Sequence, residues 1–229
     1  MFNRRSPAML VGRLSGLGGA FPRGTPTPPR RGCRAGKLAV VLAFGLGVAI
    51  VPGVPASASP KAPNVKPWLL KPSDLAGWTQ ESPSPPASGC LALRAPLADQ
   101  RPGSSGTVQF KAGSQLLAEM VASWPSHAAA VRAWTAVSSG ARGCNSYTTE
   151  TATGRPVPVT VKRVNLGHYG SLSASYQATY KLFGFPFDTD ETLVCKGRAV
   201  VLVEYSGVAP VPLSDVQPVL AIAVAKVRG

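Results

Sequence analysis

The chain has 229 residues with 24 Lys and Arg and 10 Asp and Glu, which gives a formal net charge of +14. Eight of the basic residues and none of the acids lie in residues 1–58, so residues 59–229 hold 16 bases and 10 acids, a net +6. In that part the longest basic run is Lys162-Arg163, and no aromatic residues alternate with bases. The composition therefore argues against a nucleic-acid-binding protein and predicts one domain.

Residues 38–54 form an uncharged apolar segment that is shorter than the roughly 20 residues of a membrane-spanning helix. Basic residues precede this segment and Ala56-Ser57-Ala58 follows it, an order typical of a cleaved secretory signal. We expect residues 1–58 to be a signal peptide with a long basic amino-terminal region, cut after Ala58. A retained amino-terminal anchor is the alternative. The protein is therefore expected outside the cytoplasm, secreted or in the cell envelope.

Three cysteines follow the signal, namely Cys90, Cys144 and Cys195. In an oxidising compartment they predict one disulfide and one unpaired thiol, and their positions alone leave the pairing open. No two of them have the spacing of metal ligands, and both His127 and His168 are distant from them in sequence. We expect neither a metal nor a cofactor.

In chain order, residues 59–67 read as a Pro/Lys linker and residues 68–229 as the folded, sensor-like extracellular domain. An apolar stretch at 68–78 precedes a hairpin of 107–113 and 115–124. In its second arm one face of the strand carries Leu116, Ala118, Met120, Ala122 and Trp124. Ser126 is expected to cap a helix that begins at His127 and ends at Gly140. Further strands are expected at 144–151, 157–164, 171–182, 191–195 and 198–207, the last two joined across Lys196-Gly197.

A closing helix is predicted by a capping box at Ser214 and Gln217 and by an apolar stripe of Val216, Leu220, Ala223, Val224 and Val227. The predicted class is α+β, an antiparallel sheet with two helices packed on one face, in a single disulfide-braced domain.

One acidic cluster, Asp188, Asp190 and Glu191, has oxygen ligands for a cation but lacks the Gly and the later Glu of a calcium-binding loop. We interpret it as a solvated turn at a hairpin end. His127 is interpreted as an exposed first-turn residue, because no nucleophile or carboxylate is near it in sequence.

The strand 171–182 places Tyr176 and Tyr180 on its apolar side. Both are expected either in the core or at the base of a ligand cleft between sheet and helix. In the second case they are the candidate ligand-binding residues; no catalytic residues are proposed.

The chain contains, in this order, "LLKPSDLAGW", "SGC", a hairpin, a helix with "WPS" and "AAAVRAW" that ends in "GC", then "RAVVLVEYSG" and a closing helix. This order of parts resembles the PknH-type extracellular sensor domain family of exported actinobacterial proteins. The resemblance implies a non-enzymatic module that binds an unidentified ligand in a cleft on the sheet. It also implies a disulfide between Cys90 and Cys144 with Cys195 free; the rival pairing is Cys144 with Cys195.

Two functions are therefore consistent with the sequence. The first is an exported ligand-binding, sensor-like protein whose partner is an unknown small molecule, lipid or glycan of the envelope. It is expected to bind no nucleic acid and to contact a membrane only if the signal is retained as an anchor. The alternative is a secreted enzyme acting on envelope lipid or cell-wall polymer. Two carboxylates converging in a cleft would favour the enzyme, and an apolar cleft without a perturbed acid or base would favour binding.

Overall fold

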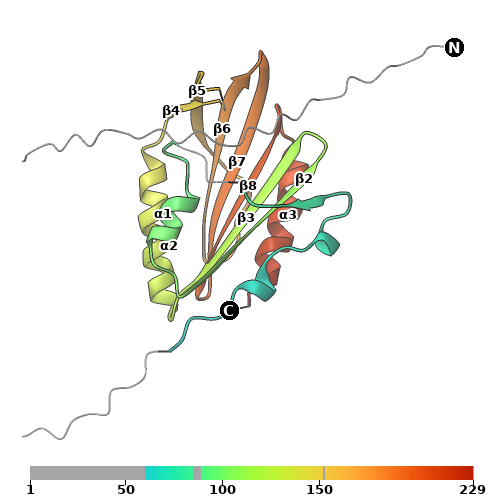
Figure 1. Ribbon diagram of the computed structural model, residues 1–229. Coiled ribbons are helices and arrows are strands. Elements are labelled where there is room, and N and C mark those ends of the chain that lie inside the picture. The colour runs from blue at the N-terminus through green and yellow to red at the C-terminus, as the bar shows by residue number, and fades with distance from the viewer. Residues whose placement is uncertain (1–59, 85–88, 152, 229) are drawn as a thin grey trace, which may run out of the picture. The chain divides into compact units, whose positions relative to one another are not determined.

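The structure is a computed structural model that describes residues 60–84, 89–151 and 153–228. The expected signal peptide and its cleavage site lie outside these residues. The elements, in chain order, are η1 (Lys66–Trp68), η2 (Pro72–Asp74), β1 (Thr79–Glu81), α1 (Arg94–Asp99), β2 (Ser104–Ala112), β3 (Gln115–Ser123), α2 (His127–Arg142), β4 (Ser146–Glu150), β5 (Pro156–Val164), β6 (Leu172–Leu182), β7 (Phe185–Lys196), β8 (Ala199–Val208) and α3 (Leu213–Lys226). The strands form one antiparallel sheet in the order β1-β2-β3-β8-β7-β6-β5-β4 (Figure 1). The predicted α+β class is confirmed.

The helices lie on opposite faces of this sheet, which differs from the expected placement of both on one face (Figure 1). The α3 helix packs with Val201 and Val203 of β8, whereas α2 packs with Val200 and Leu202 of the same strand. Alternate residues of a strand point to opposite faces, so a strand that is apolar throughout must be covered on both. Central strand β8 therefore separates two hydrophobic cores.

The α2 helix begins as predicted, because the Ser126 hydroxyl accepts a hydrogen bond from the Ala129 backbone N–H at 3.2 Å. It continues past Gly140 to Arg142, with Gly143 as its carboxyl-terminal cap. In α3 the apolar stripe is buried as expected. The expected capping box is absent, since Pro212 occupies the cap position and the Ser214 hydroxyl instead donates to Asp215.

The acidic cluster is not a turn, so that interpretation was wrong. The β6–β7 turn is formed by Phe183 and Gly184, and the acids lie within β7, where they are buried. Asp188 accepts from the Thr179 hydroxyl at 2.8 Å and Asp190 from the Gln177 amide at 3.0 Å. Cross-strand hydrogen bonds thus replace part of the water around these side chains. The second oxygen of Asp190 is buried without a hydrogen-bond partner among the described residues.

A disulfide joins Cys90 to Cys144 with a Cα–Cα distance of 5.6 Å, and Cys195 is a buried free thiol. Both agree with the predicted pairing. The bridge ties the segment before α1 to the segment before β4, which border the same region of the sheet. No helix in the described part of the chain is long and apolar enough to cross a bilayer.

Candidate functional site

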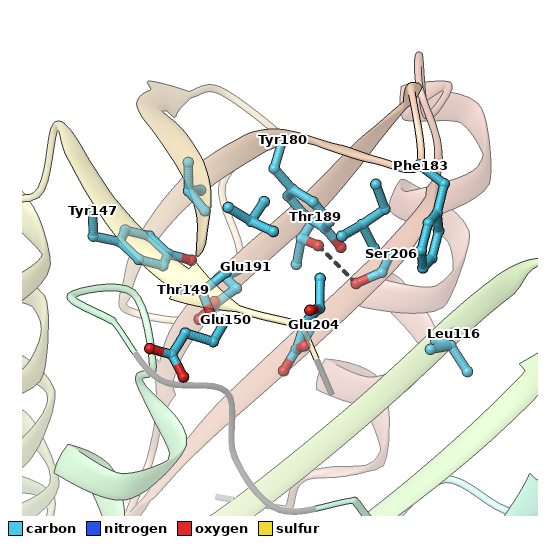
Figure 2. A pocket seen from close by; sticks show the side chains of 14 residues that line it. Leu116, Tyr147, Thr149, Glu150, Tyr180, Phe183, Thr189, Glu191, Glu204 and Ser206 are labelled. Carbon is cyan, nitrogen blue, oxygen red and sulfur yellow. Dashed lines mark hydrogen bonds between the residues drawn. The ribbon is translucent and has the colours of Figure 1, made fainter. Parts of the chain in front are cut away.

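A pocket of about 460 Å³ lies on the sheet face that α2 covers, beyond the area in contact with the helices (Figure 2). Strand alternation places its floor residues on the same side as Val200 and Leu202. Its surface is mostly apolar, and its walls come from six strands and two turns. The lining residues are Leu116, Tyr147, Thr149, Glu150, Thr151, Val157, Val159, Tyr180, Leu182, Phe183, Thr189, Glu191, Glu204 and Ser206.

The floor carries two acids that face each other across a strand pair. Glu191 of β7 and Glu204 of β8 are directly opposite in register. Side chains in such positions are roughly 5 Å apart at Cβ, so two negative charges there repel. Arg94, at the start of α1, offsets part of this charge, because its guanidinium lies 3.3 Å from a carboxylate oxygen of Glu204.

Burial controls the protonation of this pair. Glu191 is 6% exposed, and burial, followed by the charge of Glu204, raises its pKa well above the ordinary value, against the opposing effects of Arg94 and the Leu93 backbone N–H. Burial also raises the pKa of Glu204, and Arg94 opposes that rise. The raised pKa values favour the protonated form of these acids, and a carboxylic acid beside a carboxylate offers both a hydrogen-bond donor and acceptors.

Hydroxyl groups from several strands also line the floor and walls of the pocket. Thr189 and Ser206 share a hydrogen bond of 2.9 Å across β7 and β8, as Figure 2 shows. Tyr147 of β4 forms one wall, and burial together with the Glu191 charge raises the pKa of its phenol to about 12. Tyr180 forms another wall and stacks on Phe187, with ring centres 5.8 Å apart. The site can thus hold an apolar body and hydrogen-bond it at its base.

The two tyrosines singled out in the sequence have different surroundings. Tyr176 is 3% exposed beneath α2, and its hydroxyl donates to the Ser138 carbonyl at 3.3 Å, so it belongs to the core. Tyr180 is half-buried and lines the pocket. Its role in ligand binding stays a prediction. His127 is exposed at the other end of the sheet, with Nδ1 at 2.6 Å from the Gly197 carbonyl oxygen.

The sequence analysis did not predict that Glu191 and Glu204 lie next to each other, although it placed each of them in or beside an expected strand. The described residues include no cluster of three His, Cys, Asp or Glu side chains that could hold a metal ion.

No model of a known protein family matches the chain, and no curated protein is similar to it at a significant level. Among solved structures, the chain matches the crystal structure of the extracellular domain of PknH from Mycobacterium tuberculosis. The match has a TM-score of 0.54 and 12% sequence identity, and it covers 69% of this chain and 92% of that chain. At this identity the likeness establishes a shared fold, and the resemblance expected from the sequence is confirmed at that level.

Proposed function

We propose that residues 68–229 form an extracytoplasmic, sensor-like domain that binds a small amphipathic ligand in the pocket above Glu191 and Glu204. The observation that carries the proposal is the pocket itself, because about 460 Å³ of mostly apolar space is open on a folded sheet. Binding sites of this size usually combine an apolar lining with a few polar groups that orient the ligand. The fold shared with the PknH extracellular domain and the disulfide support the sensor-like role and the extracytoplasmic location.

The polar groups of the pocket define the chemistry of the ligand. Two acids and the hydroxyls of Thr189 and Ser206 form the base, whereas Val157, Val159 and Leu182 lie around it. A ligand with an apolar body and a cationic or hydrogen-bond-donating group would match both parts, since a buried carboxylate gains most from a charged or donating partner. An envelope lipid or a lipid-linked glycan fits this description.

The test is native mass spectrometry of the exported protein, followed by identification of any bound molecule. Tyr180→Ala should reduce the bound fraction, because it removes an aromatic wall of the pocket. Tyr169→Ala is the matched control: Tyr169 is another half-buried tyrosine, and its hydroxyl contacts Gln217 instead of the pocket. Equal loss of the bound molecule in both variants would contradict binding in this pocket.

The carboxylate pair specifically supports the enzyme alternative. Glycoside hydrolysis uses two neighbouring carboxyl groups, one with a raised pKa as proton donor and the other ionised as nucleophile or base. The ion pair with Arg94 counts against it, because it keeps Glu204 occupied by a fixed partner. Incubation with cell-wall fragments and envelope lipids decides between them. Product formation that Glu191→Gln abolishes would establish the enzyme.

A further inference from the structure

Exposed apolar side chains of the described residues gather at one end of the sheet. Phe183 and Phe185, 82% and 65% exposed, form the tip of the β6–β7 hairpin. Val208 pairs with Phe187 at that end of β8, and Leu116 pairs with Ser206 at the start of β3. The remaining exposed large apolar residue, Leu213, begins α3 shortly after β8 ends. Apolar patches of this kind mark contact surfaces.

The hairpin tip also has a backbone that its sequence disfavours. Leu182 and Phe185 are partners, so Phe183 and Gly184 form a two-residue loop in which φ is +52° and +86°. Such loops strongly favour Asn-Gly, because a bulky side chain is strained at positive φ. Phe183 thus costs folding free energy twice, through strain and through exposure. An unfavourable residue at a loop tip points to a function in binding.

Basic residues flank the two phenylalanines. Exposed Arg155 and Lys181 line the same shallow hollow as Leu182, Phe183 and Gly184. The exposed acid near them is Glu150, which pairs with Pro156 beside Arg155. The tip therefore combines aromatic side chains with a local excess of positive charge.

The charge of the whole domain adds to this local excess. All ten acids of the sequence are in the described part, and four are buried, namely Glu119, Asp188, Asp190 and Glu191. None of the 16 bases in residues 60–228 is buried. The surface is thus more positive than the net +6 indicates, which favours attraction to an anionic surface.

We propose that this tip docks on an anionic lipid surface, with Phe183 and Phe185 entering the interface and Arg155 and Lys181 contacting the headgroups. Aromatic and basic side chains are the combination that peripheral membrane proteins use for this contact. A second copy of the chain is disfavoured as the partner, because a symmetric contact would bring two sets of Arg155 and Lys181 together. Phe183 also lines the pocket, whereas Phe185, Arg155 and Lys181 do not, so replacing the two bases separates the lipid contact from ligand capture in the pocket. The contact does not need the anchor.

The test compares binding of the exported protein to vesicles of equimolar phosphatidylglycerol and phosphatidylcholine with binding to pure phosphatidylcholine. The wild type should prefer the anionic vesicles at about 50 mM salt and lose the preference at about 500 mM. Phe183→Asn with Phe185→Ser should weaken anionic binding about tenfold or more. Arg155→Gln with Lys181→Gln should weaken it about tenfold, and only on anionic vesicles. Any binding by residues 38–54 would be common to all variants, so the differences carry the result.

The control pair is Lys66→Gln with Arg132→Gln, which removes the same charge from exposed sites at the opposite end of the sheet. It should reduce anionic binding less than the pair at the tip. In addition, Phe183→Asn alone should raise the thermal midpoint, because Asn accepts the positive φ. Equal anionic binding by the wild type and the double Phe variant overturns the proposal. The proposal is also overturned if the wild type shows no preference for anionic vesicles but forms a dimer that the double Phe variant no longer forms.

Discussion

Replacing Glu119 by Gln is expected to remove a pH-dependent loss of stability from the domain. Glu119 lies in β3 with 0% exposure, and one of its oxygens accepts from the Leu70 backbone N–H at 2.7 Å. Its other oxygen has no hydrogen-bond partner among the described residues. Burial raises the pKa of this carboxyl from 4.5 to about 7, although the Leu70 N–H and the Lys226 charge lower it. Ionising Glu119 in the folded state is therefore costly.

The magnitude follows from the two pKa values. One pH unit corresponds to about 1.4 kcal/mol, so the interval from 4.5 to about 7 amounts to about 3 kcal/mol. The folded state binds this proton more tightly than the unfolded state does. The contribution is therefore complete below pH 4.5 and is lost as the pH rises through about 7. Asp190, whose pKa burial raises to about 6, acts in the same direction.

Urea unfolding of the wild type, Glu119→Gln and Glu81→Gln at pH 5 and pH 8 tests this expectation. The Gln side chain resembles the protonated acid and keeps an oxygen for Leu70, so stability at pH 5 should hardly change. At pH 8 the variant should be more stable than the wild type, by up to about 3 kcal/mol. Exposed Glu81 on β1 serves as the control and should show no such gain. If Glu119→Gln follows the wild type at both pH values, the argument from burial is refuted.

Three further outcomes are expected. Tyr176→Phe should cost about 1 kcal/mol in urea unfolding through loss of the hydrogen bond to Ser138, and Tyr176→Ala about 3 to 5 kcal/mol through the cavity it leaves. Replacing Cys90 and Cys144 by Ser should cost about 4 kcal/mol, since the bridge spans 54 residues, and non-reduced peptide mapping should show these two cysteines linked. The intact mass of the exported protein should correspond to a chain that begins directly after Ala58. A mass that includes residues 37–58 would establish an anchor.

Local sequence signals predicted the elements that depend on neighbouring residues. Gly113 at a turn and alternation from Leu116 to Trp124 were sufficient for the β2–β3 hairpin. Ser126, which precedes an alanine-rich stretch, was sufficient to predict where α2 begins. These features are set by turn and capping chemistry within a few residues, which a sequence displays directly.

Burial of the acidic segment in β7 could not be seen in this way. Asp188 and Asp190 look like turn residues because carboxylates are usually solvated. Their partners Thr179 and Gln177 lie 9 and 13 residues earlier in the chain and meet them only through the register of β6 and β7. The actual turn uses Phe183, a residue that turn chemistry does not favour. The start of β7 was therefore expected at Glu191, whereas the strand begins at Phe185.

The pocket depends on the same kind of long-range register, at the β7–β8 hairpin. A turn centred on Lys196-Gly197, as expected from the sequence, would place Glu191 opposite Leu202. The observed loop is Gly197-Arg198, because Lys196 pairs with Ala199, and this displacement brings Glu191 opposite Glu204. Both registers keep the acids on the same face, since the pairing changes by two residues. Only the second places two carboxylates side by side at the pocket floor, with Arg94 beside them. One residue in the position of a turn thus determines whether this site has an acidic base, which is why the register must be known before its chemistry can be argued.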